Sequence, residues 1–297
     1  MERLALKNPF GAPVYRMARC SSTMDEARNL AARGAPHGTA LTADFQEAGR
    51  GRIRGRPWLG RAGENLFATV LLRYPGAIPE ALTLKAGLAA AGAIEDFAPA
   101  LTGSVEVKWP NDIMLCSGPD AGPGRTACKA AGILTESDGE TVYIGMGVNL
   151  GQTEFPPELR AKAGSIALAL QSIAAPAGVP PRPAVPGAEP APPGPSGPLS
   201  PESRFVLLEK ILARLFQELE GPEQAETWRS RLEQRLFRRG TQVLFIEGAA
   251  DSGKEVRGVL SGIGAGGELL IIPQGERCPR SFVTGELDVY GEEKPAG

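Results

Sequence analysis

The sequence predicts an α+β fold in which a mixed or largely antiparallel sheet with helices is followed by a small β-barrel. Three observations carry this prediction. Strand and helix patterns are interleaved up to about residue 174. A proline-rich segment then holds 11 of the 27 prolines within residues 176–201, and mainly short apolar runs between glycines remain after residue 240. We therefore expect two units, residues 1–239 and 240–292, with a mobile insertion at about 174–200 in the first.

The first unit begins with a capped helix. Residues 22–33 predict a helix that Ser22 or Thr23 caps, that carries two acidic residues in its first turn, and that Gly34 ends. Alternating apolar residues and the Asp-Gly dipeptide after residue 137 predict the strands and one hairpin of this unit. The remaining elements are strands at 40–45, 66–73 and 105–109, an Ala-rich helix at 80–97, and a hairpin of 130–137 with 141–150.

The proline-rich segment contains no aromatic residue, so it cannot offset its ordering entropy by burial and should be an extended loop. Its composition favours a plain insertion or linker, and a docking site for a proline-binding module is the alternative. Beyond it, Ser200 and Pro201 are predicted to begin a helix that continues through 205–220. A second helix at about 223–238 and about five strands within 240–290 complete the chain.

Residue counts exclude several classes of protein. Lys plus Arg is 32 and Asp plus Glu is 34, so a net charge of −2 gives no general field for coating nucleic acid. His37 is the only histidine, which excludes a histidine-cluster metal site, and the four cysteines form no CxxC pair. We find no secretion signal and no apolar run long enough to cross a membrane, so we expect a cytoplasmic protein.

The most informative motif is the Arg/Gly loop, residues 46–58, with the sequence QEAGRGRIRGRPW. An empty loop of like charges repels itself and should be disordered, whereas a ligand with several negative charges would order it. Trp58 offers an aromatic face for a nucleotide base. A small anionic ligand, a nucleic acid and a plain solvated loop all remain open from the spacing alone. The loop contains Arg50, Arg52, Arg54 and Arg56, and with Arg61 just after it five positive charges lie between Glu47 and Glu64 with no acid between them.

Three further motifs each have a structural and a functional interpretation. In Lys108–Asp112, KWPND, Pro110 should end a strand, and Asn111 and Asp112 either cap their own turn or contact a nucleotide. Lys129, flanked by small residues before an apolar strand, either points into a pocket or is an ordinary strand-end lysine. The alternating glycines Gly145 and Gly147 clear one strand face for a ligand or for a close packing contact.

Taken together, the order of these motifs resembles that of biotin protein ligases, which attach biotin to carboxylase carrier domains. The resemblance covers most of residues 15–173 and extends weakly into the C-terminal barrel, which is similar to the family's SH3-like domain. It rests on Ser-Ser-Thr at 21–23, the Arg/Gly loop, KWPND, Lys129-x-x-Gly-Ile-Leu-x-Glu, and Gly-x-Gly-Val-Asn at 145–149. Since Ser22 lies so close to the start, we expect the enzyme-only type without a DNA-binding domain.

The resemblance implies a two-step reaction: ATP and biotin form biotinyl-5′-AMP and pyrophosphate, and a lysine of a biotin carboxyl carrier protein then takes the biotin. It implies catalytic roles for Lys129 and Arg52, with Mg²⁺ arriving on the nucleotide and no dedicated metal site in the protein. We expect no nucleic acid or membrane partner and a monomer or homodimer. The implied biotin-binding residues are Ser22, Thr23, Met24, Gln46, Arg50, Gly51, Arg52, Lys129, Gly145 and Gly147. The implied nucleotide-binding residues are Arg50, Arg52, Trp58, Asn111, Asp112 and Asn149.

The sequence departs from the family pattern in three places. The Arg/Gly loop is one residue longer than usual, Met24 occupies a position that is often polar, and the turn at 117–127 is long and expected to be mobile. A lipoate ligase of the same fold is the nearest alternative. A non-catalytic biotin sensor and a nucleic-acid module that uses the arginines are alternatives of a different class.

Overall fold

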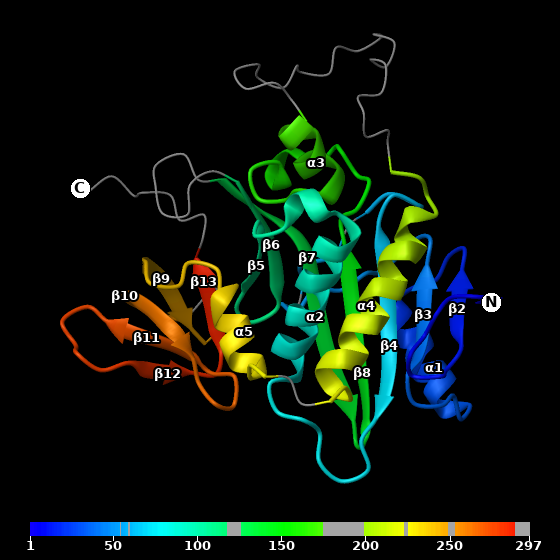
Figure 1. Cartoon of the computed structure of the whole chain (residues 1–297), viewed down its shortest axis with the longest axis horizontal. Helices are drawn as coiled ribbons and strands as arrows, with labels where there is room; N and C mark the ends of the chain where they lie inside the picture. Colours follow the sequence, from blue (N-terminus) through cyan, green and yellow to red (C-terminus); the bar gives the residue numbers. More distant parts are fainter. Residues whose placement is uncertain are drawn as a thin grey trace.

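Two antiparallel-rich sheets and five α-helices make up the described part of the chain (Figure 1). The computed structural model describes residues 1–53, 55–58, 60–117, 126–174, 199–222, 225–248 and 253–288. The eight-stranded sheet has the order β1-β2-β3-β4-β8-β7-β6-β5, and the five-stranded sheet has the order β12-β11-β10-β9-β13. The predicted α+β class is confirmed, and none of the described helices is long and apolar enough to span a membrane.

The eight-stranded sheet is antiparallel at every junction except that of β2 with β3. The predicted strand at 66–73 and the predicted hairpin are confirmed at its centre, where long apolar runs are buried on both faces. Its strands are β1 (Glu2–Leu4), β2 (Val14–Met17), β3 (Thr39–Ala43), β4 (Leu66–Arg73), β5 (Val105–Lys108), β6 (Asp112–Ser117), β7 (Thr126–Asp138) and β8 (Thr141–Val148).

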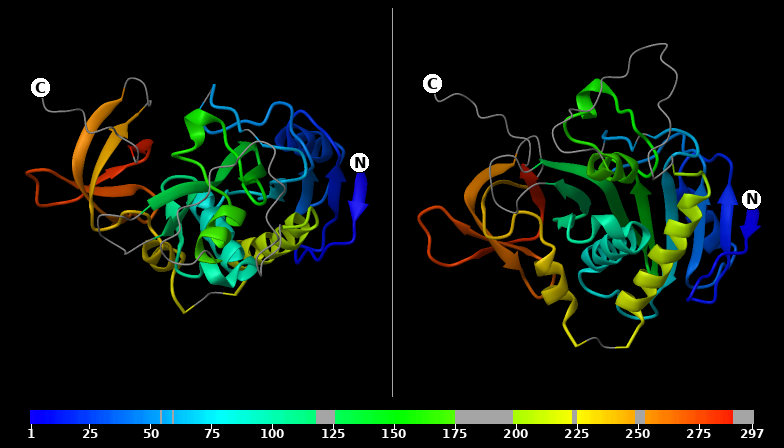
Figure 2. Two further views of the ribbon diagram at one scale, coloured as in Figure 1. Left: turned by 90° about the horizontal axis from the view of Figure 1, so that it is seen from above. Right: turned by 45° about the horizontal axis from the view of Figure 1, so that its top comes forward.

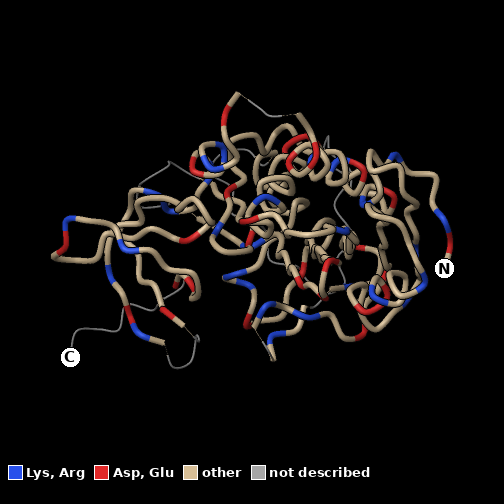
Figure 3. Tube along the Cα trace, turned by 90° about the horizontal axis from the view of Figure 1, so that it is seen from below, with Lys and Arg blue, Asp and Glu red and all other residues tan. Residues whose placement is uncertain are grey.

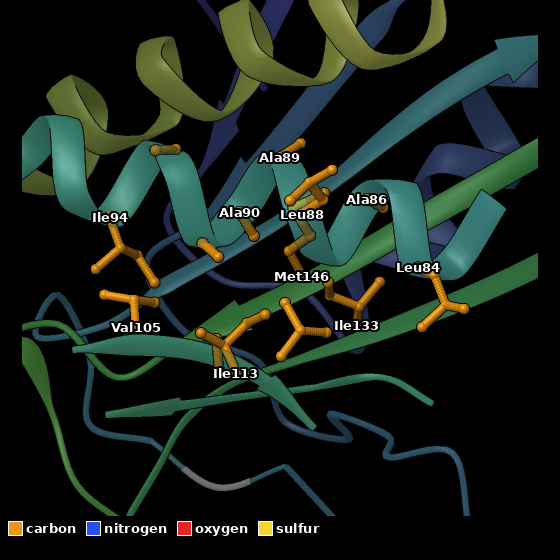
Figure 4. Close-up of a cluster of buried hydrophobic side chains, with 14 of the residues drawn as sticks. Leu84, Ala86, Leu88, Ala89, Ala90, Ile94, Val105, Ile113, Ile133 and Met146 are labelled. Atoms are coloured by element: carbon orange, nitrogen blue, oxygen red, sulfur yellow. The ribbon is translucent and has the colours of Figure 1, made fainter. Parts of the chain in front are cut away.

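Helices cover the two faces of this sheet differently. α2 (Leu82–Phe97) and α4 (Ser203–Leu219) lie side by side on one face, and their apolar stripes form the main core with the sheet (Figures 1, 2 and 4). The small side chains of Ala86, Ala89 and Ala90 let α2 approach the strands closely. α1 (Thr23–Ala32) packs on the opposite face in a separate cluster, which includes Leu71 of β4. Successive residues of β4 therefore pack into different layers, because side chains alternate between the two faces of a strand.

Strand β6 was not predicted. We expected Asn111 and Asp112 to lie on a turn after β5, but Asp112 is the first residue of β6, which returns antiparallel to β5. The turn is only Trp109–Asn111, with a cis peptide bond before Pro110. Because the apolar run Ile113–Leu115 follows the turn residues at once, its pattern is too short to stand out in the sequence. Most of the turn expected at 117–127 lies outside the described residues.

The helices after the proline-rich segment are shorter than predicted. α4 begins at Ser203 rather than at Ser200, because residues 200–203 form a turn in which the Ser203 N–H donates to the Ser200 carbonyl. α5 (Trp228–Gln234) occupies only the middle of the predicted 223–238 and is capped by the Thr227 hydroxyl. The helix α3 (Ile166–Ala174) was not predicted. Residues 175–198, which include most of the expected insertion, lie outside the described residues.

The C-terminal unit contains the five strands predicted from its texture, but among the described strands the ladder is an open sheet rather than a closed barrel. It packs against the β5 end of the large sheet (Figure 1). Phe245 lies 5.9 Å from Trp109, ring centre to ring centre, and the Trp109 indole N–H donates to the Gly267 carbonyl at 3.0 Å. The strands are β9 (Gln242–Glu247), β10 (Lys254–Ile263), β11 (Leu269–Pro273), β12 (Arg280–Phe282) and β13 (Gly285–Asp288).

Candidate active site

The predicted motifs converge on the α1 side of the large sheet, between the start of α1, the Arg/Gly loop, the β5–β6 turn and strands β7 and β8. Backbone contacts hold the loop beside α1. Cys20 and Gln46 form an isolated bridge, and the N–H groups of Glu47 and Ala48 donate to the carbonyls of Cys20 and Ser21. The predicted helix cap is confirmed, since the Ser22 hydroxyl accepts from the Met24 N–H at 3.3 Å.

A small pocket of about 50 Å³ lies at this junction. Its polar corner contains the buried residues Ser22 and Thr23 with the half-buried Gln46. The Gln46 side-chain carbonyl accepts two hydrogen bonds from Thr23, from the backbone N–H at 2.8 Å and from the hydroxyl at 3.0 Å. All ten residues predicted to bind biotin line this pocket, together with Trp58, Asn111, Gly132, Ile133, Leu134 and Met146.

Two glycines of the small pocket are required by close packing. A Cβ on Gly147 would lie 2.4 Å from the Trp58 ring, and a Cβ on Gly145 would lie 2.7 Å from the Met24 sulfur. Any side chain at these positions would therefore displace an aromatic or thioether wall of the pocket. Met24, which is 4% exposed, forms an apolar wall of the pocket.

A larger pocket of about 680 Å³ lies on the other side of Trp58. Trp58, Asp112, Lys129 and Asn149, all predicted site residues, line it together with the unpredicted Lys108. A third hollow, of about 100 Å³, shares Trp58 and Lys129 with both other pockets. Its lining includes Arg52, Lys108, Asn111 and Asp112. Trp58 and Lys129 thus stand where all three spaces meet.

Cations cluster around one carboxylate at this meeting point. Lys129 Nζ lies 2.6 Å from one oxygen of Asp112 and 5.2 Å from the centre of the Trp58 ring. Lys108 Nζ lies 3.8 Å from the other Asp112 oxygen. Burial lowers the pKa of Lys108 despite the opposing attraction of Asp112. Two lysines against one carboxylate leave excess positive charge, which suits a phosphate or carboxylate ligand.

The described residues of the Arg/Gly loop face acidic side chains from other segments. Carboxylates from other segments neutralise it: both guanidinium NH₂ groups of Arg50 donate to Asp25, at 2.7 and 3.0 Å, and Arg56 contacts Glu286 at 3.2 Å. Arg52 donates to the Gly285 carbonyl at 3.1 Å. Figure 3 shows positive and negative segments interspersed along the trace rather than segregated. Arg54 lies outside the described residues.

The two predicted asparagines have structural bonds. The Asn111 amide donates to the Ile133 carbonyl at 2.9 Å, across to β7 rather than within its own turn. The Asn149 amide donates to the Gly164 carbonyl at 3.0 Å. Both side chains are buried and line a pocket, so their remaining polar atoms are what a nucleotide can meet.

The sequence did not single out several residues that the structure brings to the site. Lys162 lines the large pocket from the segment before α3, on the same pocket as Arg56 of the Arg/Gly loop. Ile246, Glu286, Leu287 and Asp288 reach the same pocket from the C-terminal sheet. No pattern marks these positions, because their role depends on tertiary docking. Lys108 had a signal, since it begins the KWPND motif.

Residues 17–149 match the biotin/lipoate A/B protein ligase family. The match covers somewhat less than half of the chain. The match ends at Asn149 and so includes every predicted site residue, from Ser22 onward, and both central strands. The matched segment therefore contains the residues that line the small pocket, the Arg/Gly loop and the two lysines.

Proteins to which this chain is similar include named biotin ligases. The bifunctional ligase/repressor BirA of Bacillus subtilis is 37% identical over 158 residues, which is 50% of this chain and 44% of that protein. A biotin–[acetyl-CoA-carboxylase] ligase of Paracoccus denitrificans is 39% identical over 141 residues, 45% of this chain and 53% of that protein. The chain thus spans about half the length of the curated relatives it matches.

The fold likeness extends over nearly the whole chain. The biotin protein ligase from Aquifex aeolicus in complex with biotin and ATP superimposes with a TM-score of 0.64 at 24% identity, covering 93% of this chain and 97% of that one. The Leishmania major biotin protein ligase in complex with biotinyl-5-AMP gives a TM-score of 0.57 at 21% identity, covering 91% and 98%. At these identities the likeness shows a shared fold that includes the C-terminal unit.

Proposed function

We propose that this chain is an ATP-dependent biotin ligase that forms biotinyl-5′-AMP and transfers biotin to a lysine of a biotin carboxyl carrier protein. The observation that carries the proposal is the pair of pockets that meet at Lys129 and Trp58. A bisubstrate reaction between two anions needs two adjoining sites with fixed cations at their junction.

In the first step, a biotin carboxylate oxygen attacks the α-phosphorus of ATP, and the bond from that phosphorus to the β-phosphate oxygen breaks. Pyrophosphate leaves, and a mixed anhydride remains. Lys129 is assigned the bridge between the carboxylate and the α-phosphate, with Arg52 as the second catalytic cation. No protein nucleophile is needed, and burial raises the pKa of the nearby Cys20 thiol to about 11, so it is neutral at physiological pH.

The site residues divide between the two substrates. We assign biotin to the small pocket, with Ser22, Thr23 and Gln46 at its polar corner and Met24 as an apolar wall. The Arg/Gly loop and Trp58 form part of the wall of this pocket, so they would lie against the bound ring. We assign the nucleotide to the large pocket, with Trp58 packing on adenine. Closure of the loop would then keep water from the anhydride.

In the second step, the lysine amine of the carrier attacks the carbonyl carbon of the anhydride, AMP leaves and the amine loses a proton. The acceptor class is inferred from the named activity of the Paracoccus relative. We further propose a cytoplasmic protein that acts as a monomer or homodimer and without nucleic acid. Residues 1–239 are assigned as the ligase domain and 240–292 as an SH3-like accessory domain.

Magnesium would accompany the nucleotide rather than occupy a resident site. The described residues contain no group of three or more His, Cys, Asp or Glu side chains that could hold an ion. Asp112, the carboxylate at the junction, is already engaged by Lys129. One carboxylate together with substrate phosphates is a usual Mg²⁺ environment, so Asp112 fits this role. The ion would neutralise phosphate charge there.

The test is exchange of labelled pyrophosphate into ATP by the purified full chain with Mg²⁺, comparing biotin, lipoate and no acid. Exchange with biotin alone is expected and would establish the first step. Exchange with lipoate instead would move the chain to the lipoate ligases. Absence of exchange with either acid, together with a biotin-induced rise in melting temperature, would indicate a sensor and overturn the catalytic proposal.

A further inference from the structure

The chain just after β8 is joined to the chain just before β4 by three consecutive hydrogen bonds. The Leu150 N–H donates to the side-chain oxygen of Asn65 at 3.1 Å, and the Gly151 N–H donates to the Glu64 carbonyl at 2.7 Å. The Asn65 amide nitrogen donates to the side-chain oxygen of Gln152 at 2.6 Å. One asparagine thus holds both the backbone and a side chain of the segment that follows β8.

Both ends of this network fix how the two side-chain amides are turned. A backbone N–H can only donate, so the Asn65 atom facing Leu150 is the oxygen, and its nitrogen faces Gln152. At the far end, the Gln152 nitrogen donates to the Glu154 carbonyl at 2.8 Å, and a carbonyl can only accept. The two requirements agree, so every contact in the network pairs a donor with an acceptor.

The network lies between the core and the large pocket. Asn65 is fully buried and lines none of the three pockets, whereas Gln152, which is 4% exposed, lines the large pocket beside Trp58 and Asn149. Phe155 lines the same pocket three residues further along the chain. Asn65 therefore contacts no part of the proposed nucleotide site directly, but it holds a residue that forms the wall of that site.

A second side-chain contact to this segment is weaker. Arg61 lies 2.6 Å from Glu154, but both side chains are more than half exposed, so solvent screens the pair. Without the Asn65 side chain, the buried Leu150 N–H and the Gln152 oxygen would lose their partners, and unpaired buried polar groups are costly. The segment would relax towards water to satisfy them, and Gln152 would leave its place in the pocket wall.

We propose that Asn65 is a positioning residue of the large pocket, which acts by holding Gln152 and the segment that follows it against the space where the nucleotide binds. This inference rests on the proposed use of the large pocket for ATP. It separates the two substrates, because biotin is assigned to the small pocket, which neither Asn65 nor Gln152 lines. Loss of either side chain should therefore weaken ATP binding and leave biotin binding unaffected.

The variants are Asn65→Ala, Gln152→Met and the double variant, with Thr42→Val as the matched control. Methionine keeps the length of glutamine and leaves the bond from Leu150 to Asn65 in place, so Gln152→Met is the milder change. Thr42 is as buried as Asn65, and its hydroxyl donates to the Phe67 carbonyl at 2.9 Å, away from this segment. Biotin-dependent pyrophosphate exchange by the full chain gives the KM for ATP, the KM for biotin and the rate at saturation.

We expect each single variant to raise the KM for ATP about tenfold, the effect of one lost hydrogen bond. The KM for biotin and the rate at saturation should stay near wild type. Because Asn65 acts through Gln152, the double variant should be no worse than Asn65→Ala alone. Thr42→Val should match the wild type in all three quantities.

An unchanged KM for ATP in Gln152→Met would overturn the inference, even if Asn65→Ala did not fold. Effects that multiply to about a hundredfold in the double variant would also overturn it, because they would show that the two residues act independently. A fall in the rate at saturation with a constant KM for ATP would do the same. Absence of biotin-dependent exchange in the wild-type chain would overturn the proposed function as well, so the two failures are distinguishable.

Discussion

Replacing Lys129 by methionine removes the cation at the junction of the pockets while keeping the length of the side chain. The aliphatic part of Lys129 packs beside Gly132 and Trp58, so methionine preserves those contacts. The side chain is 34% exposed, and its ion pair with Asp112 is therefore screened, which limits the cost in unfolding free energy to under about 1 kcal/mol. The variant should fold like the wild type.

The loss of catalytic rate in this variant should be much larger than its loss of stability. Loss of one preorganised charge from a closed site costs about 3 kcal/mol, which is a factor of about 100–1000 in rate. The substitution also leaves the Asp112 carboxylate balanced only by Lys108 Nζ at 3.8 Å, so a negative charge then faces the incoming phosphate. Both effects oppose adenylate formation, and we expect a loss of several orders of magnitude.

The assay separates the two steps. Biotin-dependent pyrophosphate exchange measures adenylate formation, and transfer from supplied biotinyl-5′-AMP to a carrier domain measures the second step alone. Lys129→Met should abolish most exchange and reduce transfer far less, while Lys254→Met, an exposed charge removal on β10, should change neither. Exchange within tenfold of wild type in a folded Lys129→Met protein would refute the assigned role.

Three further outcomes are expected. Asp25→Asn removes the carboxylate that holds Arg50, so biotinyl-5′-AMP should dissociate from the enzyme faster. Filter binding measures this dissociation rate. An unchanged rate would show that the ligand, rather than Asp25, positions Arg50. Because burial lowers the pKa of Lys108, its ammonium group loses its charge at a pH below the usual pKa of lysine. The KM for ATP should therefore rise at alkaline pH. This rise should vanish in Lys108→Arg, because arginine stays charged. Deletion of 176–200, whose composition supports no packed core, should leave exchange within a few-fold of wild type; loss of soluble protein would show that the segment is needed for folding.

The sequence predicted the small pocket better than the large one for a physical reason. Residues such as Ser22, Gln46 and Gly147 belong to compact motifs, and each motif supplies one wall through its own backbone. The large pocket is lined by side chains such as Lys162 and Glu286 that meet only after distant segments dock. Local sequence patterns do not show which distant segments dock together, so those residues could not be identified from the spacing of motifs.

The charges around the Arg/Gly loop were likewise difficult to predict from the sequence. No acidic residue lies between Glu47 and Glu64, and the local charge of the arginines in between predicts repulsion. Asp25 lies in α1 and Glu286 in β13, at sequence separations of 25 and 230 residues from their partners Arg50 and Arg56. The neutralising charges were visible in the sequence, but only the fold shows which arginine each one faces. Counting charges among neighbours along the chain therefore misses these two ion pairs.

The C-terminal sheet is therefore part of the candidate site, although its short apolar runs between glycines predict a separate unit. β13 contacts the Arg/Gly loop through Arg52 and Arg56, and Leu287 and Asp288 line the large pocket beside the lysines. Trp109, in the motif that carries Lys108, is anchored to the same sheet through the Gly267 carbonyl. A boundary at residue 240 divides the chain by composition, but it passes through one wall of the proposed nucleotide pocket. A domain boundary drawn from sequence composition thus differs from one drawn around the proposed nucleotide pocket.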